Sequence, residues 1–307
     1  MTQTEDIRQA RRNTFQKWIG DPLTALPAYV SWGIFRALPV RWASALGGFL
    51  GACAGRILRR RNRIGLINLK IAFPEKSEVE RKEILNKMWR HWGRFYAEMP
   101  HTTELFNRAE MKGLEHLKRL AKSGGFVCSA HLGNWELAVS QPLFQGLTLN
   151  PVYRRANNPL LDKLMFQRRA GILIPKGGSG ARTIVRVLHQ KGVVVMLCDQ
   201  KLREGIEVPL FGHPAMTAPA IAVLALKMKM PIVMARSIRQ PDGHFVMEVS
   251  APLELPPKYG EAEVRQVMIE INRRLEAWIR ENPEQWLWIH RRFDKSIYEP
   301  DSGKLSK

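Results

Sequence analysis

Apolar and polar residues follow two different patterns along this chain, and the change lies near residue 111. Before it, long apolar stretches and helical spacing dominate; after it, short strand-like apolar runs alternate with longer helical patterns. That alternation predicts an α/β domain built in layers. The predicted strands are residues 126–129, 147–153, 193–197, 231–237 and 245–249, and the predicted helices are residues 134–144, 160–169, 180–190, 218–229 and 261–280.

The N-terminal region is the most apolar part of the chain. Residues 22–55 are interrupted only by two arginines and a proline, at positions 36, 41 and 39. The charge-free halves, 22–35 and 42–55, are each shorter than the roughly 20 residues that a membrane-spanning helix needs. They predict an interfacial or re-entrant pair of helices as readily as a single span, and a buried helical hairpin is a third interpretation.

Aromatic and basic residues around this region favour contact with a membrane. Trp18, Tyr29, Trp32 and Trp42 suit the headgroup level of a bilayer. Arginines crowd positions 56 to 63, and basic residues beside an apolar segment favour the anionic, cytoplasmic leaflet. We therefore expect the N-terminal helices to associate with a membrane from its cytoplasmic side.

The remaining patterns divide the chain into four parts. Ser77 and Glu80 have the spacing of a capping box at the start of a helical stretch that reaches Pro100. The expected parts are residues 1–58 (membrane-associating helical segment), 59–110 (helical connector), 111–300 (α/β domain) and 301–307 (flexible tail).

Composition narrows the possible partners. A chain of 307 residues, 45% of them apolar, can bury a full core, which makes disorder an unsuitable description. Cys53, Cys128 and Cys198 lie in apolar runs without the paired spacing of a disulfide framework or a zinc site, so they predict buried thiols. The net charge of +20 implies an anionic partner: nucleic acid, an anionic membrane surface or a phosphorylated substrate.

His131 is the leading candidate for chemistry. It follows the predicted strand 126–129, and open α/β sheets bind ligands at the carboxyl ends of their strands. A turn at Gly133 would let Glu136, in the first helical turn, bond one ring nitrogen and leave the other free to take a proton. An ordinary loop histidine is the alternative. A metal site is not expected, because no second histidine or cysteine pair lies nearby.

Other charged residues lie near predicted strand ends. Asp199 follows strand 193–197 as His131 follows its own strand, so both are expected at the same edge of the sheet; Asp199 could bind an arginine or a sugar hydroxyl, or cap a turn. Guanidinium groups bind phosphate with two parallel hydrogen bonds, although a solvated basic face is the alternative. The candidate phosphate-binding arginines are Arg154, Arg155, Arg168 and Arg169.

Several motifs together resemble the lipid A biosynthesis acyltransferases, the late acyltransferases that add secondary lauroyl or myristoyl chains. The resemblance extends from about Trp18 to Phe293, and its specificity comes from the order, spacing and number of the motifs. They are HLGNWE (131–136), YRRANNPLLD (153–162) followed by Arg168 and Arg169, DQ (199–200), VPLFGHPAMT (208–217) and PEQWLWIHRRF (283–293).

The resemblance implies a glycerol-3-phosphate acyltransferase-like fold, with a central mixed sheet flanked by helices and N-terminal apolar membrane-associating helices. It further implies an enzyme without cofactor or metal, in which His131, oriented by Glu136, deprotonates a hydroxyl that attacks the thioester of acyl-carrier protein. The backbone N–H groups of Gly133 and Asn134 are candidate oxyanion donors. Arg291 and Arg292 are expected to face phosphate.

The implied acceptor is an anionic phosphorylated glycolipid, a lipid A precursor, at the cytoplasmic face of the bacterial inner membrane. Acylation of another membrane glycolipid, such as a phosphatidylinositol mannoside, from acyl-CoA is the neighbouring possibility. An alternative from another class is a non-catalytic basic protein that docks on membranes or nucleic acid; within the family interpretation, no nucleic-acid partner is expected.

Overall fold

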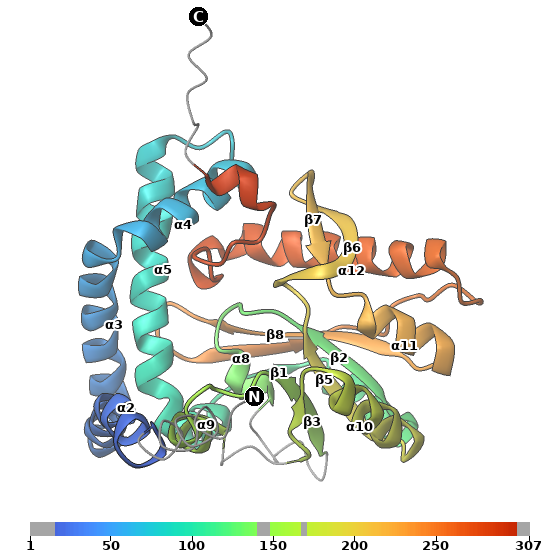
Figure 1. Ribbon diagram of the computed structural model, residues 1–307, viewed down its shortest axis with the longest axis horizontal. Coiled ribbons are helices and arrows are strands. Elements are labelled where there is room, and N and C mark those ends of the chain that lie inside the picture. Colours follow the sequence, from blue (N-terminus) through green and yellow to red (C-terminus); the bar gives the residue numbers. More distant parts are fainter. Residues whose placement is uncertain (1–15, 140–147, 167–170, 300–307) are drawn as a thin grey trace, which may run out of the picture.

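A seven-stranded mixed sheet forms the centre of the protein (Figure 1). The computed structural model describes residues 16–139, 148–166 and 171–299. The strand order is β1-β9-β8-β2-β5-β3-β4, and every neighbouring pair is parallel except the antiparallel β8 and β9. This sheet confirms the predicted α/β class. The strands are β1 (Glu110–Lys112), β2 (Gly125–Ser129), β3 (Leu149–Tyr153), β4 (Ile174–Pro175), β5 (Val193–Leu197), β8 (Ile232–Arg239) and β9 (Phe245–Val249).

Helices cover both faces of the sheet because its central strands are apolar on both sides. All five residues of β2 are buried; Phe126 and Cys128 pack into one core, whereas Val127 packs into another, as the two-residue period of a strand requires. Side chains from α10, α11 and α12 belong to the first core, and those from α6 and α7 to the second. These helices are α6 (Thr102–Asn107), α7 (Leu114–Ser123), α10 (Gly178–His189), α11 (Ala220–Met228) and α12 (Glu261–Glu281).

All five predicted strands are present within a few residues of their predicted bounds, as β2, β3, β5, β8 and β9. The sequence pattern did not predict β1, β4 or a separate hairpin. The hairpin consists of β6 (Lys201–Leu210) and β7 (His213–Thr217). Charged residues, a glycine and a proline interrupt the apolar alternation of β6, so the period-two signal is weak. Phe211 and Gly212 both have positive φ, the geometry of a tight hairpin turn.

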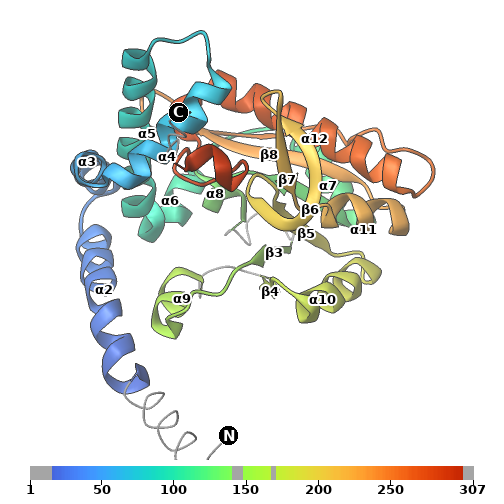
Figure 2. The same ribbon diagram turned by 45° about the horizontal axis from the view of Figure 1, so that its top comes forward.

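From residue 16 onwards, where the described part of the chain begins, four long helices precede the sheet. Pro39 separates α2 (Asp21–Ala37) from α3 (Val40–Ile57), and α4 (Arg59–Ala72) follows at once. The predicted capping box is confirmed: Ser77 and Glu80 exchange backbone-to-side-chain hydrogen bonds at the start of α5 (Glu78–Glu98). Figure 2 shows α2 extending away from the sheet, towards α9 (Pro159–Phe166), to which Tyr29 and Asn158 tie it by hydrogen bonds.

Glycines allow α3 and α5 to lie in backbone contact along their lengths (Figure 1). A Cβ atom added to Gly51 would lie 2.2 Å from the carbonyl oxygen of Trp89, and one added to Gly93 would lie 2.0 Å from the carbonyl oxygen of Gly47. Both distances are far below van der Waals contact. The small residues therefore set the spacing of this helix pair.

We expect Gly51→Ala to lower the free energy of unfolding by about 1–3 kcal/mol, because the added methyl must push the helices apart. Gly33→Ala is the matched control: Gly33 lies in α2 with no atom within 4 Å of the place that the added methyl would take, so the same change should stabilise by about 0.5 kcal/mol. Urea unfolding followed by circular dichroism measures both. Equal effects of the two substitutions would contradict the packing argument.

The outer sides of α2 and α3 form an exposed apolar surface, which we call the α2–α3 apolar face. Trp32, by contrast, is buried against Phe95 and Trp135, so its predicted place at a headgroup belt is wrong. The exposed apolar side chains of α2 and α3 also exclude a fully buried helical hairpin. Within the described residues, no helix combines the length and apolarity needed to cross a bilayer. The face comprises Trp18, Leu23, Leu26, Val30, Ile34, Trp42, Leu46, Phe49, Leu50 and Ile57.

Candidate active site

A sharp turn after β2 positions His131. Gly133 has φ +60°, and a Cβ there would lie 1.7 Å from the carbonyl oxygen of Ser237, so only glycine fits. The turn is anchored on two sides, since the N–H groups of Gly133 and Asn134 donate to the carbonyl oxygens of Gln285 and Ser237. His131 therefore stands at the carboxyl end of β2, before α8 (Trp135–Val139) begins.

Asp199 binds the imidazole of His131. The parallel register pairs Ser129 of β2 with Leu197 of β5, so the residues two positions beyond each strand also come side by side. His131 Nδ1 lies 2.8 Å from Asp199 Oδ1, and the backbone N–H of His131 donates to Oδ2 at 3.0 Å. The prediction that His131 and Asp199 lie at the same edge of the sheet is thus confirmed.

The hydrogen bonds of this pair define its protonation state. Burial alone would raise the pKa of Asp199, but the adjacent His131 and the indole N–H of Trp286, which donates to Oδ2 at 2.9 Å, lower that pKa well below its ordinary value. An ionised carboxylate only accepts hydrogen bonds, so Nδ1 carries the proton and Nε2 is the acceptor. The amide of Gln200 donates to Nε2 at 3.2 Å. The imidazole is therefore in the tautomer that can take a proton at Nε2.

Glu136 does not make the hydrogen bond to His131 that was predicted for it. Among the described residues, the hydrogen-bond partners of the His131 ring are Asp199 and Gln200, so Asp199 rather than Glu136 orients the imidazole. Glu136 lies in the first turn of α8 as expected and is only 5% exposed. The reason for the difference is the strand register, which supplies a carboxylate to Nδ1 from the neighbouring strand.

The predicted oxyanion donors also need correction. The backbone N–H groups of Gly133 and Asn134 already donate to Gln285 and Ser237, at 3.0 Å each, and these bonds hold the turn in place. They are not available to a substrate oxygen without breaking the turn. Among the described residues, the side-chain amide of Gln200 is the hydrogen-bond donor to Nε2 of His131.

The predicted arginines fall into four groups, one of which is Arg291, on the lining of a cavity next to α4. Arg154 and Arg155 follow β3 and are exposed, whereas Arg168 and Arg169 lie outside the described residues. Arg292 is fully buried and donates to the carbonyl oxygen of Met216 and to Thr217 Oγ1, so its expected role in facing phosphate is wrong. Burial lowers the pKa of Arg292 to about 10.

Arg292 instead fixes the C-terminal segment, residues 282–299, to the β6–β7 hairpin. The same segment reaches the site at Trp286, and the N–H of Leu287 donates to the carbonyl oxygen of His131 at 3.3 Å. The backbone N–H of Lys201 donates to His290 Nε2 at 3.2 Å. Gln200 and Trp286 both stand inside motifs, but neither side chain carries a charge, so the sequence gives no individual signal for their roles.

An apolar aromatic cluster adjoins the imidazole. The Trp135 ring meets the His131 ring edge to face at 5.1 Å between centroids, and it stacks on Phe95 at 4.0 Å. Leu164 of α9 and Trp32 of α2 complete the cluster. Apolar surface beside a base suits an aliphatic substrate. In the part of the chain that the structure describes, no group of three histidine, cysteine or acidic side chains could hold a metal ion.

His91 supports the turn from behind. It is buried, and its Nε2 lies 3.1 Å from the carbonyl oxygen of Gly133, which can only accept a hydrogen bond, so Nε2 carries a proton. Burial, with repulsion from Arg239, lowers the pKa of His91 to about 3. Since an unfolded histidine has a pKa near 6.5, the unfolded chain binds more protons below that pH.

We therefore expect the free energy of unfolding to fall as pH drops from about 6.5 towards 3, with about 2 kcal/mol lost at pH 5 from His91 alone. His91→Gln should flatten this slope by up to one proton, while His189→Gln, at an exposed end of α10, should leave it unchanged. Urea titrations at half-unit pH steps provide the test. An unchanged slope in His91→Gln would refute the assignment.

A histidine–aspartate pair lies at the carboxyl edge of a mixed α/β sheet, next to an apolar cluster, and such a pair can activate a hydroxyl. The model of the bacterial lipid A biosynthesis acyltransferase family matches residues 22–295. The chain belongs to this family, and the predicted resemblance is confirmed.

Several similar proteins with curated names are acyltransferases of lipid A biosynthesis. The chain is 30% identical over 286 residues to the lipid A biosynthesis lauroyltransferase of Escherichia coli (strain K12), covering 88% of this chain and 91% of that protein. It is 24% identical to the myristoyltransferase of the same strain, over 82% of this chain and 80% of the relative. The palmitoleoyltransferase is 27% identical, over 83% and 86%. The protein is thus a member of an acyltransferase family.

A solved structure is also similar: 1-acyl-sn-glycerophosphate (LPA) acyltransferase, PlsC, from Thermotoga maritima. It is 12% identical to this chain, with a TM-score of 0.37, and the match covers 76% of this chain and 97% of that one.

Proposed function

We propose that this protein transfers a fatty acyl chain from acyl-carrier protein to a hydroxyl of a lipid A precursor. The observation that carries the proposal is the His131–Asp199 pair, with Nδ1 bonded to the carboxylate at 2.8 Å and Nε2 in the acceptor state, in a chain of the lipid A acyltransferase family. Relatives named as lauroyl, myristoyl and palmitoleoyl transferases support a fatty acyl chain as the group that is transferred.

The reaction needs one base and no metal. Nε2 of His131 takes the proton of the acceptor hydroxyl as its oxygen attacks the thioester carbonyl, so that a C–O bond forms. The tetrahedral intermediate then expels the carrier thiolate, the C–S bond breaks, and His131 returns the proton to the sulfur. Asp199 stabilises the imidazolium between these steps. The acceptor hydroxyl replaces the Gln200 amide as the hydrogen-bond partner of His131 Nε2, and the amide then donates to the developing oxyanion.

The acceptor is an anionic phosphorylated glycolipid, and Arg154, Arg155 and Arg169 are proposed to bind its phosphates. Glu136, which is buried in the first turn of α8, is proposed to act on the substrate rather than on the ring. The net charge of +20 suits acyl-carrier protein, an acidic partner, as donor.

The protein is proposed to dock on the cytoplasmic face of the bacterial inner membrane through the α2–α3 apolar face. The face ends at Ile57, directly before the arginines at the start of α4, and apolar residues beside basic ones favour an anionic bilayer surface. Such docking would bring the lipid acceptor to the edge of the sheet without requiring a membrane-spanning helix.

The test is reconstituted transfer. The purified protein, mixed with acyl-carrier-protein thioesters of different chain length and a lipid A precursor in mixed micelles, should add one acyl group, seen by mass spectrometry as a single ester. Parallel reactions with acyl-CoA, and with a phosphatidylinositol mannoside, should be slower. Transfer only from acyl-CoA, or only to the mannoside, would refute the donor or the acceptor; no transfer to any lipid would refute the proposed activity.

A further inference from the structure

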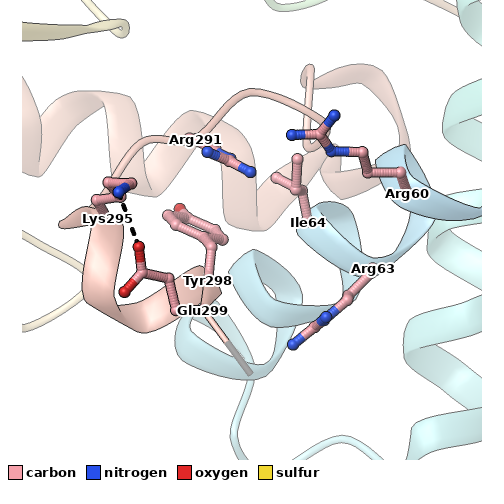
Figure 3. A pocket seen from close by; sticks show the side chains of 7 residues that line it. All are labelled: Arg60, Arg63, Ile64, Arg291, Lys295, Tyr298 and Glu299. Carbon is pink, nitrogen blue, oxygen red and sulfur yellow. Dashed lines mark ion pairs between the residues drawn. The ribbon is translucent and has the colours of Figure 1, made fainter. Parts of the chain in front are cut away.

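A second concave site lies between α4 and the C-terminal segment, and nothing in the proposed reaction uses it. Figure 3 shows four cationic side chains around a cavity of about 300 Å³: Arg60 and Arg63 come from α4, and Arg291 and Lys295 from the C-terminal segment. Ile64, Tyr298 and Glu299 complete its lining. The volume matches the lower end of small-molecule sites.

The cavity is strongly electropositive. Glu299 pairs with Lys295 at 2.9 Å, whereas no ion pair within the described residues involves Arg60, Arg63 or Arg291. Three guanidinium groups and one ammonium group face a single carboxylate, so the cavity carries an excess of positive charge and its like charges repel one another. A bound anion relieves this repulsion, and planar guanidinium groups match the oxygens of phosphate better than a simple ion-pair partner would.

The walls of the cavity are held in place from beneath. Asn68 of α4 is fully buried and donates to the carbonyl oxygens of Trp288 and His290, at 2.6 and 2.7 Å. It also accepts from the hydroxyl of Tyr298 at 2.5 Å. These bonds fix α4 to the C-terminal segment, so the arginines from the two segments keep a set separation. The exposed side chains of Arg60, Arg63 and Lys295 thus extend from backbone segments that are fixed relative to each other, which lowers the entropy lost when an anion binds.

The cavity is also linked to the candidate active site by a short stretch of chain. Arg291 stands five positions after Trp286, which donates to the carboxylate of Asp199.

We propose that Arg60, Arg63, Arg291 and Lys295 form a phosphate-binding site that takes the phosphate of a membrane lipid. Two sources share this chemistry: the phosphorylated head of the glycolipid acceptor and the headgroup of an anionic phospholipid. Assigning the phosphate to the acceptor rests on the proposed function, whereas the site itself does not.

Vesicle binding tests the site without requiring activity. The full chain should bind phosphatidylcholine vesicles containing phosphatidic acid, a phosphomonoester, more tightly than vesicles of equal surface charge containing phosphatidylglycerol. The double variant Arg60→Ala/Arg291→Ala should lose this preference and bind phosphatidic acid about tenfold more weakly. Lys118→Ala/Arg119→Ala removes the same charge from exposed positions on α7 and should keep the preference.

Equal losses in the two double variants, or no preference between the lipids in the wild type, would overturn the proposal in favour of general electrostatic attraction. A loss confined to binding of acyl-carrier protein would also overturn it, because the cavity would then be part of a protein-docking surface.

Kinetics separates the two sources. If the acceptor supplies the phosphate, Arg60→Ala/Arg291→Ala should raise KM about tenfold for the phosphorylated acceptor, with kcat and the KM of the dephosphorylated acceptor unchanged. If phospholipid supplies it, KM should respond to the phosphatidic acid content of the micelle in the wild type alone. Absence of any transfer would count against the proposed function but leave the vesicle result decisive for the site.

Discussion

Asp199→Asn should lower kcat for acyl transfer about a thousandfold with little change in KM. An asparagine of the same size can still contact His131 Nδ1, but its amide cannot stabilise the imidazolium and can present an N–H that favours the wrong tautomer. Because Asp199 touches the imidazole rather than the substrate, it is a positioning residue, and the loss should appear in the chemical step. Steady-state kinetics with acyl-carrier-protein thioester and lipid A precursor gives both constants.

The matched comparison is Glu136→Gln. If Glu136 oriented the ring, this variant would show the thousandfold loss in kcat, and Asp199→Asn would have a small effect. The observed bond between His131 and Asp199 leads to the opposite order, with the loss in Glu136→Gln divided between kcat and KM because this residue is proposed to act towards the substrate. The reversed result would refute the role assigned to Asp199. Near-ultraviolet circular dichroism of both variants should match the wild type, which separates lost orientation from lost folding.

His131→Ala should lower kcat/KM by about a thousandfold or more, since the hydroxyl would then lack a base, and general base catalysis contributes on the order of 10² to 10⁴ in rate. The missing ring leaves a space lined by Trp135 and Asp199. Added imidazole should enter that space and restore activity at least tenfold, which a purely structural role would not predict.

Two further variants complete this test. His131→Gln fills the same space and should resist rescue by imidazole, whereas His189→Ala, an exposed histidine at the end of α10, should keep full activity. Undiminished transfer by His131→Ala would remove His131 from the mechanism, whatever the family likeness implies.

The sequence by itself determined the elements and the family. Continuous apolar runs located β2 and β5, Pro39 separated two apolar helices, and Ser77 with Glu80 marked the start of α5, because each of these features acts within a few residues of chain. The ordered motifs identified the lipid A acyltransferase family, and the position of His131 after a buried strand identified the candidate base.

Only the tertiary structure decided which groups surround that base. Glu136 is near His131 in sequence, yet Asp199 binds its ring, because the register of β2 against β5 brings together residues 68 positions apart. Likewise, Arg291 and Arg292 are equivalent in the sequence, but one lines a cavity with α4 and the other is buried under the β6–β7 hairpin. Local pattern fixes which way a chain folds over a few turns, whereas strand register and burial depend on distant segments that no single stretch of sequence contains.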